Sequence, residues 1–564
     1  MIRSILTILS FLVLTSAQAD QIISTSFGDV QGSKAISRDG RTFYQFLGIP
    51  YAKAERFQPP VNPDPWQEVR DSTKQGPVCP QIQSNFDDSA PKVFLGSEDC
   101  LNLNVFSPKL PQPGKAKVLL PVMVWFQGGG GDVYGAGDYE PQYYMDTDIV
   151  LVTFNARLGF LGFLNLGNEL ASGNQRLKDQ VLMLKWVQKN IENFGGDPAR
   201  VTLNGVDSGA AELSYHILSP MSKGLFAGAI SQKGSPLLPT FIRNPIYQAK
   251  RYGAHVGCPL ESREGLLECL KGKRPEDLVL SFNRWISDLT ENEFLKFGIS
   301  IEYIDSEKAF LTEIPFVLLK EGRIANKVPW LMHLDLNAGF TAFTAKILVS
   351  KNLQKKLNEN IKTILPRYLD YDNIASDPDV VTQKIIDNYF DGGEITESNI
   401  LQLVNLVTYR FFSGPTIQTG DYYPDHAGIY GLMNGYVPSG GCPSLFGYGE
   451  ALGGACNEVI SYQFPLTMYY PGINKTSKDY PLSKKLVELY ASFMEMGKPT
   501  KFWGEVQNWL VYDRINRFGV NIGKDGGMSC HFMTPEFAKS FQIWTALLKN
   551  ELAAELETPK QEIF

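Results

Sequence analysis

The alternation of apolar runs and amphipathic segments between residues 118 and 235 constrains the fold most. The runs at 118–126 and 149–154 are apolar and β-branched, which is typical of strands that are buried on both faces. One helix carries six apolar residues at helical spacing on one face: Leu177, Val181, Leu184, Val187, Ile191 and Phe194. We expect strands at 118–126, 149–154, 200–205 and 226–232, and helices at 177–194 and 209–219. This order predicts an α/β fold with a parallel, doubly wound sheet.

Composition excludes several functional classes. The chain has 564 residues, a net charge of −7 and 43% hydrophobic residues, which is typical of a globular protein with a large core. The acidity argues against nucleic acid as a partner, because phosphate binding needs a basic face. No second long apolar run follows the N-terminus, so we expect no membrane span. Residues 240–420 look mostly helical, and no domain break stands out.

The first residues resemble a secretion signal. Arg3 gives a positive start, Ile5 to Leu14 form an apolar stretch, and Ala17 to Ala19 fit the small-x-small cleavage rule. We therefore expect residues 1–19 to be a signal peptide and the mature, secreted, extracellular protein to begin at Asp20. Asn474 begins the sequence Asn-Lys-Thr, and we expect it to be glycosylated on a surface loop.

The seven cysteines fit an oxidising compartment. None lies in a C-x-x-C pair, so neither a zinc site nor any other metal site is predicted. Two local pairs and one distant pair are expected to form disulfides, which leaves Cys456 free: Cys79 with Cys100, Cys258 with Cys269, and Cys442 with Cys530.

The segment from Gly205 to Gly209 (GVDSG) lies between a predicted strand and a predicted helix. Its glycine spacing is that of the nucleophile elbow, G-x-S-x-G, of α/β hydrolases. In that turn the central side chain projects above the sheet, and its neighbours must be glycine or small. The central residue here is Asp207. Taking Ser208 as the nucleophile would abandon the glycine spacing.

Long segments around this motif resemble the type B carboxylesterase/cholinesterase family. The matching stretches are 46–52, 97–105, 155–163 and 173–205, and the resemblance is strong over 28–236. It implies an α/β-hydrolase fold, with a central, mostly parallel, twisted sheet flanked by helices and a helical cap region. It also implies a single domain over 20–564, no cofactor, and the two local disulfide loops.

The family's reaction needs a serine, a histidine and a carboxylate acting together. The resemblance places Asp207 at the serine position, Ala338 at the acid position and Cys456 at the histidine position. Main-chain N–H groups of an oxyanion loop complete the family's site, and their remnant here is Gly129, Gly130 and Ser208. We therefore expect no catalytic triad.

Two catalytic alternatives remain open. An aspartate at an elbow attacks alkyl halides or epoxides in some α/β hydrolases, but those enzymes need a histidine to release the intermediate. The five histidines of the chain lie away from the predicted site, and we expect packed or surface roles for all of them: His216, His255, His333, His426 and His531. A Cys456 nucleophile would need a cationic neighbour, and the sequence offers none.

The resulting prediction is a pseudoenzyme, a secreted carboxylesterase-like protein with a non-catalytic role. It would recognise an extracellular protein, as the family members similar to neurotactin, glutactin, gliotactin and neuroligin do. One alternative is a carrier of a small apolar ligand or ester. Another is an active carboxylic-ester or Asp-nucleophile hydrolase with an unusual site.

Overall fold

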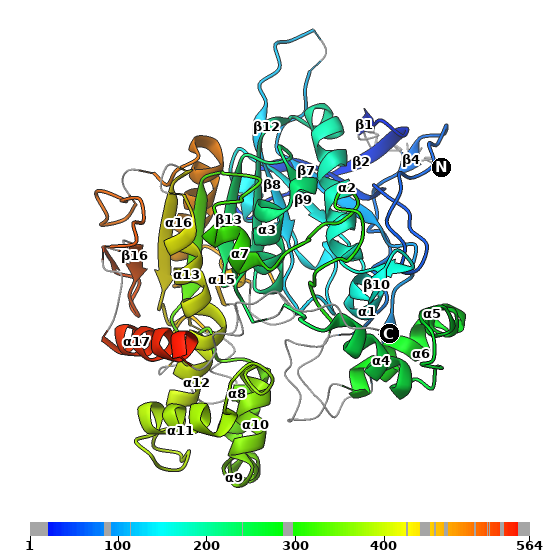
Figure 1. Ribbon diagram of the computed structural model, residues 1–564. Coiled ribbons are helices and arrows are strands. Elements are labelled where there is room, and N and C mark those ends of the chain that lie inside the picture. Colours follow the sequence, from blue (N-terminus) through cyan, green and yellow to red (C-terminus); the bar gives the residue numbers. More distant parts are fainter. Residues whose placement is uncertain are drawn as a thin grey trace, which may run out of the picture.

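A computed structural model gives the fold (Figure 1). It describes the chain from residue 21 to residue 550, with gaps at 84–91, 113, 240, 286–296, 425–426, 440–451, 456–457, 467–471, 501–502, 516, 518 and 531–534. The predicted signal peptide lies outside the described residues, as do Cys442, Cys456, His426 and His531.

Two sets of elements build the described part of the chain. The strands are β1 (Gln21–Ser24), β2 (Asp29–Ile36), β3 (Thr42–Pro50), β4 (Arg70–Asp71), β5 (Gln81–Ile82), β6 (Phe94–Leu95), β7 (Asn102–Ser107), β8 (Leu120–Phe126), β9 (Val150–Phe154), β10 (Asn165–Asn168), β11 (Ala171–Ser172), β12 (Gly196–Val206), β13 (Gly228–Gln232), β14 (Trp330–Asp335), β15 (Ile429–Asn434), β16 (Gly519–Ile522) and β17 (Met528–Ser529). The helices are α1 (Gly159–Phe163), α2 (Gln175–Asn190), α3 (Ser208–Leu218), α4 (Pro245–His255), α5 (Arg263–Gly272), α6 (Pro275–Trp285), α7 (Pro315–Lys320), α8 (Ala342–Val349), α9 (Lys351–Glu359), α10 (Ile361–Tyr368), α11 (Pro378–Tyr389), α12 (Leu401–Val407), α13 (Gly414–Tyr422), α15 (Glu458–Ser461), α16 (Tyr480–Met496) and α17 (Pro535–Asn550), with short turns η1 (Ala136–Asp138), η2 (Tyr144–Asp146), η3 (Ile191–Phe194), η4 (Pro220–Ser222) and the π-helical η5 (Thr408–Ser413).

The predicted parallel sheet is confirmed. Among the described residues the main sheet has 13 strands, in the order β1-β2-β3-β7-β9-β8-β12-β13-β14-β15-β16-β17, with β4 beside β2. The strands from β9 to β16 in this order pair in parallel, and antiparallel strands lie at both edges. Several boundaries differ from prediction, among them the following three. β8 begins at Leu120 because Val118 is 77% exposed. β12 begins early because Gly196 already pairs with Leu120. The predicted helix 177–194 ends as the 3-10 turn η3.

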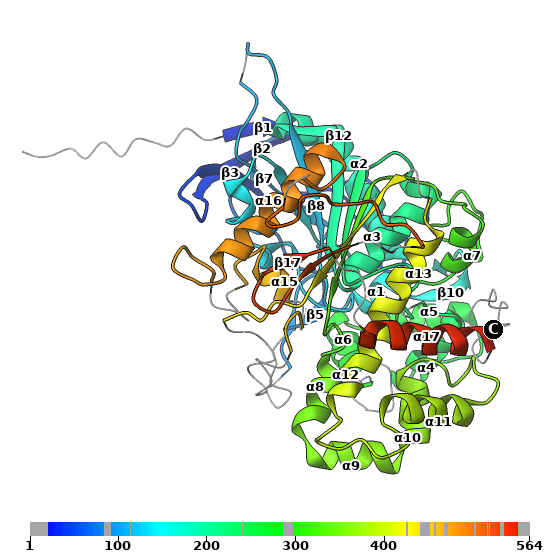
Figure 2. The same ribbon diagram turned by 90° about the vertical axis from the view of Figure 1, so that its left-hand side faces the viewer.

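Alternate side chains of β8 enter two separate cores, one on each face of the sheet. Val122 and Val124 belong to the core that contains Leu184 of α2 and Leu213 of α3. Trp125 belongs to the core that contains Tyr490 of α16. This alternation follows from the two-residue period of a strand. It explains why the run reads as continuously apolar, since both faces are covered by helices (Figure 2).

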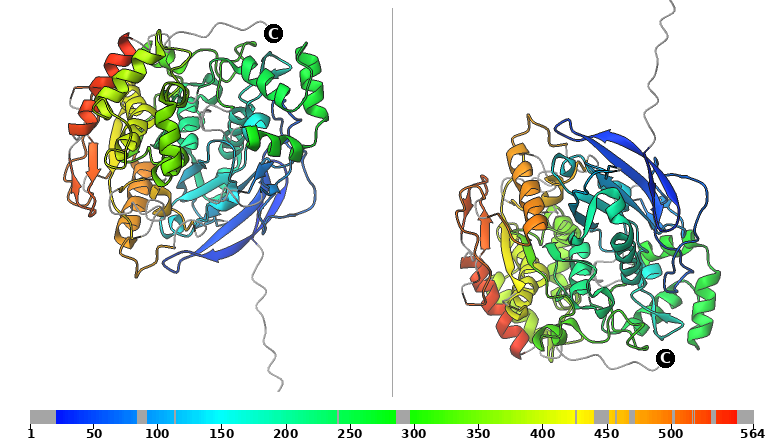
Figure 3. Two further views of the ribbon diagram at one scale, coloured as in Figure 1. Left: turned by 90° about the horizontal axis from the view of Figure 1, so that it is seen from below. Right: turned by 90° about the horizontal axis from the view of Figure 1, so that it is seen from above.

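A third core lies among the helices between β14 and β15. It joins residues of α8 to α12 with residues of α17, and Figure 1 shows these helices together below the end of the sheet. Seen from below (Figure 3, left), these yellow-green helices lie in front of the sheet, between α17 in red and α4 to α6 in green. The expectation that residues 240–420 are mostly helical is confirmed, apart from β14. The single-domain assignment stays a prediction.

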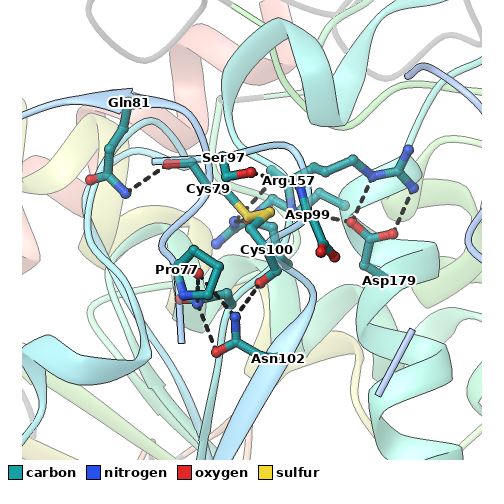
Figure 4. The surroundings of a disulfide bond; sticks show 12 residues. Pro77, Cys79, Gln81, Ser97, Asp99, Cys100, Asn102, Arg157 and Asp179 are labelled. Carbon is teal, nitrogen blue, oxygen red and sulfur yellow. Dashed lines mark hydrogen bonds and ion pairs between the residues drawn. A yellow bond between two sulfur atoms is a disulfide. The ribbon is translucent and has the colours of Figure 1, made fainter. Parts of the chain in front are cut away.

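Both local disulfides form, Cys79–Cys100 and Cys258–Cys269. Figure 4 shows the first beside Asn102, whose amide nitrogen donates to the carbonyls of Pro77 and Cys100 at 2.9 Å each. The predicted Cys442–Cys530 disulfide is not formed in this structure. Cys530 is a free, exposed thiol whose sulfur lies 3.8 Å from the carbonyl oxygen of Asn508, and Cys442 lies outside the described residues. No described helix is long and apolar enough to cross a membrane.

Candidate functional site

Asp207 is the single residue that joins β12 to α3. Its backbone has φ 54° and ψ −123°, a conformation that residues other than glycine rarely adopt. Its N–H donates to the carbonyl of Gln232 at 2.9 Å, and its carbonyl accepts from the N–H of Ala211 at 3.0 Å. The sharp, strained strand-to-helix turn of a nucleophile elbow is therefore present, with an aspartate at its apex.

The two glycines of the motif are required by close packing. A Cβ atom on Gly209 would lie 2.2 Å from the carbonyl oxygen of Phe126, and one on Gly205 would lie 2.7 Å from the same oxygen. Phe126 ends β8, the strand beside β12. The neighbouring strand thus leaves no room for a side chain on either side of the apex, which explains the G-x-x-x-G spacing.

Ser208 does not replace Asp207 at the apex. Its Oγ is buried and makes no hydrogen bond to any described residue, although Ser208 as a whole is partly exposed, as Asp207 is. The hydroxyl is the first side chain of α3, one position past the turn. The elbow therefore presents the aspartate rather than the serine.

The loop 128–131 follows β8 and lies against the elbow. A Cβ atom on Gly128 would lie 3.3 Å from Cβ of Asp207. Gly129 and Gly130 have φ values of 91° and 67°. Within the described part of the chain, the N–H groups of Gly129, Gly130 and Ser208 donate to no other residue. Unused main-chain donors beside an elbow are what an oxyanion hole requires, so this part of the site keeps its backbone.

Ala338 lies in the turn after β14, where the family carries its acid. It is fully buried, and its N–H donates to the carbonyl of Asp335 at 3.2 Å. The next residue, Gly339, packs so closely that a Cβ atom would lie 2.3 Å from the backbone nitrogen of Thr408. The turn is thus closed over a methyl group at the acid position.

The loop that should carry the histidine is described on both sides of Cys456, which itself lies outside the described residues. The N–H of Ala455 donates to Oε2 of Glu458 at 3.2 Å, and the N–H of Glu458 donates to the carbonyl of Ala455 at 2.9 Å. Asn337 ties this loop to the acid turn, because its side chain donates to the carbonyl of Gly453 at 2.7 Å.

A pair of buried glutamines connects the elbow to the same loop. Gln463 Nε2 donates to Gln232 Oε1 at 2.7 Å, and Gln232 Nε2 donates to Gln463 Oε1 at 3.0 Å. The carbonyl of Gln232 also receives the N–H of Asp207. Direct hydrogen bonds thus connect the described flanks of the histidine loop to the elbow. Separate hydrogen bonds connect the same loop to the acid turn.

Two buried acids near these turns were not predicted as site residues. Burial raises the pKa of Asp335 to about 6. The hydrogen bond that Asn434 donates to it at 3.0 Å and the charge of Lys233 both lower this pKa, but by less than burial raises it. Burial also raises the pKa of Glu458 to about 9, despite the N–H of Ala455. Perturbed acids gather at functional sites, although buried structural groups show the same shifts. Glu458 lies two residues after the histidine position in the sequence. This closeness is the signal by which sequence reasoning could have identified it as a site residue.

No described histidine is placed to act as a base at the elbow. His216 is buried between Ser222 Oγ at 2.6 Å and Gln180 Oε1 at 2.8 Å, and burial lowers its pKa to about 3. His333 is buried against the hydroxyl of Tyr490 at 2.6 Å, and burial likewise lowers its pKa to about 3. His255 is exposed on α4. The packed or surface roles that were predicted for these three histidines are confirmed.

No set of three or more His, Cys, Asp or Glu side chains among the described residues is arranged to hold a metal ion. The predicted glycosylation residue Asn474 is exposed, and its Oδ1 accepts from the hydroxyl and the N–H of Thr476. Its modification stays a prediction.

Comparisons with known proteins agree with this fold. The model of the carboxylesterase family matches residues 19–538. Pyrethroid hydrolase Ces2a of Mus musculus is 41% identical over 556 residues, with 95% of this chain and 92% of the relative covered. Esterase E4 of Myzus persicae is 32% identical over 513 residues, with 88% and 89% covered.

The juvenile hormone esterase of Tribolium castaneum is 32% identical over 516 residues and covers 85% of this chain, which covers 84% of it. Among solved structures, the juvenile hormone esterase of Manduca sexta, with OTFP covalently attached, superposes with a TM-score of 0.80. That match is 25% identical and covers 94% of this chain and all of the other.

Proposed function

Because this chain belongs to the carboxylesterase family, we propose that it is a member that has lost its catalytic triad and binds another molecule instead of hydrolysing an ester. The observation that carries this proposal is the elbow itself. Its backbone keeps the geometry that presents a nucleophile, yet its apex carries Asp207. An aspartate has no alcohol hydroxyl, so it cannot form the acyl ester that a serine forms.

The acid turn supports the same proposal. Ala338 is fully buried, and the turn around it is held by main-chain hydrogen bonds and by the packing of Gly339 on Thr408. The family's reaction needs a carboxylate at this position to orient the histidine, and the methyl group of Ala338 cannot do so. With Cys456 at the histidine position, each of the three groups that work as a unit is replaced. Independent replacement of all three is easier to explain by lost catalysis than by new chemistry.

The proposed role is recognition of an extracellular protein, by a surface of the rigid hydrolase-like fold. It places the chain with the non-catalytic, neurotactin-like members of the family. Two disulfides in the described residues fit an oxidising compartment, and they support export of the chain after cleavage of residues 1–19. The elbow would then serve as a structural joint between β12 and α3.

The test uses protein recovered from the medium of secretory cells, so that export is tested at the first step. Hydrolysis of short and long p-nitrophenyl esters is measured for the wild type, Asp207→Ala and Asp207→Ser. We expect trace turnover that is equal in the wild type and Asp207→Ala, because a site without its triad still accelerates hydrolysis by about 10³–10⁴-fold over water.

Two outcomes would overturn the proposal. Turnover near about 10 s⁻¹ that disappears in Asp207→Ala would make Asp207 a working nucleophile. Turnover of that size that persists in Asp207→Ala would locate an active site elsewhere in the chain. The Asp207→Ser variant is the matched control. We expect it to remain slow, because the serine alone lacks a base and an acid.

A further inference from the structure

A cavity lies apart from the elbow. It has a volume of about 630 Å³ and is bounded by α7, α13, α17 and the segment 236–243. Residue 240 of this segment lies outside the described residues. None of the elbow, oxyanion-loop or acid-turn residues lines it. Figures 1 and 2 both show α17 crossing close to α13, and in Figure 1 this lies at the side of the sheet that carries β16. Cavities of roughly 300–1,000 Å³ are the size that holds small organic ligands.

The apolar walls are aromatic and preformed. Six rings line the cavity: Phe241, Phe316, Tyr409, Tyr422, Phe541 and Trp544. Phe316 and Tyr422 meet edge to face with centroids 5.4 Å apart, and Tyr409 meets Phe541 in the same way at 6.5 Å. The indole N–H of Trp544 donates to the hydroxyl of Tyr389 at 3.1 Å. Because these contacts fix the rings in place, an apolar chain can enter without reordering the wall.

The polar groups of the cavity are mostly cationic. Five cations line it, Arg243, Lys320, Arg410, Arg517 and Lys549, against two carboxylates, Asp370 and Asp421. The net charge of the lining is +3 in a chain whose net charge is −7. Such a concentration of one sign at a concave site raises the local concentration of the opposite charge.

The cations differ in how firmly they are held. Arg517 pairs with Asp421 at 2.7 Å and lies over the ring of Phe541 at 4.3 Å. Arg410 is 5% exposed, donates to the carbonyls of Leu369 and Asp370, and lies 5.3 Å from the ring of Trp544. These two brace the inner wall. Lys320 and Lys549 are exposed at the rim, where a lysine can turn toward a ligand.

From this arrangement we infer that the cavity binds an amphipathic monocarboxylate, such as a fatty acid or an arylalkanoic acid. The apolar body lies on the aromatic walls, and the carboxylate meets the cationic rim at Lys320. An organic cation of the same length would gain the aromatic contact but would be repelled by the net positive lining. A neutral alcohol would gain the apolar contact alone.

This inference does not depend on the fate of Asp207, since the cavity shares no residue with the elbow. Binding is measured by calorimetry below the critical micelle concentration with three probes of equal chain length: dodecanoate, 1-dodecanol and dodecyltrimethylammonium. We expect dodecanoate to bind at least tenfold more tightly than the alcohol, and the cation to bind most weakly. Equal affinities for all three, or no dodecanoate binding up to a Kd of about 1 mM, would overturn the inference.

Variants then locate the binding. Lys320→Glu is expected to weaken dodecanoate binding at least tenfold and to leave dodecanol binding unchanged, and Gln418→Trp, which fills the cavity from α13, is expected to weaken both. Lys115→Glu, a charge reversal at an exposed lysine that does not line the cavity, is the control. Thermal unfolding confirms that each variant is folded. Dodecanoate binding that Lys320→Glu and Gln418→Trp both leave intact, or that is lost only in Asp207→Phe, would place the ligand in the site above the elbow and overturn the inference.

Discussion

The elbow and the acid turn have diverged in different ways from the family's catalytic site. At the elbow the glycines and the backbone of the motif are kept, and only the apex side chain differs. At the acid turn the side chain that would reach the histidine is absent, and a buried methyl group stands in its place. The difference teaches which features the fold itself requires. Packing of Gly205 and Gly209 on β8 demands glycine whether or not the chain is an enzyme, whereas nothing in the packing demands a serine or a carboxylate.

The largest expected effect tests whether the packing of the elbow requires glycine at position 209. Gly209→Ala should cost more than about 4 kcal/mol of unfolding free energy, because its Cβ would lie 2.2 Å from the carbonyl oxygen of Phe126 and the backbone must move. Chemical denaturation measures the loss, and failure to recover folded protein counts as the same result.

Gly272→Ala is the matched control for this prediction. Gly272 ends α5, and a Cβ atom there would meet no atom within 4 Å. Alanine should therefore be neutral or stabilising by up to about 1 kcal/mol at this position. If both substitutions proved equally mild, the elbow would not be held by its packing against β8, and the comparison would fail.

A smaller effect is expected at the acid turn. Ala338→Glu places a carboxyl group where the side chain is fully buried, which should cost about 3 kcal/mol for an unpaired polar group. Ala254→Glu, at an exposed position on α4, is the control and should change little. Urea unfolding of the two variants gives the difference. A glutamate at 338 that is tolerated as well as one at 254 would show that the acid pocket is still open.

The sequence predicted the part of the molecule that local patterns determine. The apolar runs of β8 and β9, the one-sided helix α2 and the paired glycines around Asp207 each carry their own signal, because strand and helix periods act over a few residues. The burial of Asp335 and Glu458 was not predicted, since it depends on β15 and on the turns that cover them. The aromatic cavity was not predicted either, because Phe241 and Trp544 are distant in the sequence and meet only in the folded chain.

The smallest expected effect tests whether the histidine loop, which contains Glu458, has become a purely structural element. Burial raises the pKa of Glu458 to about 9, with smaller contributions from the charges of Asp335 and Asp479. The folded state then holds a proton that the unfolded state releases above a pKa of about 4.3. The contribution of Glu458 to stability should therefore fall as the pH rises from 6.5 to 8.5, by at most about 1.4 kcal/mol per pH unit.

Glu458→Gln should flatten this dependence, because a glutamine keeps the neutral amide at every pH. Thermal unfolding between pH 6.5 and 8.5 measures it, above the range in which Asp335, with its pKa of about 6, releases most of its proton. Glu505→Gln, at an exposed position, is the control and should keep the wild-type slope. A wild-type slope that Glu458→Gln leaves unchanged would mean that Glu458 is ionised in the folded protein. The loop would then hold a buried negative charge beside the elbow, a feature of an operating site rather than of a structural joint.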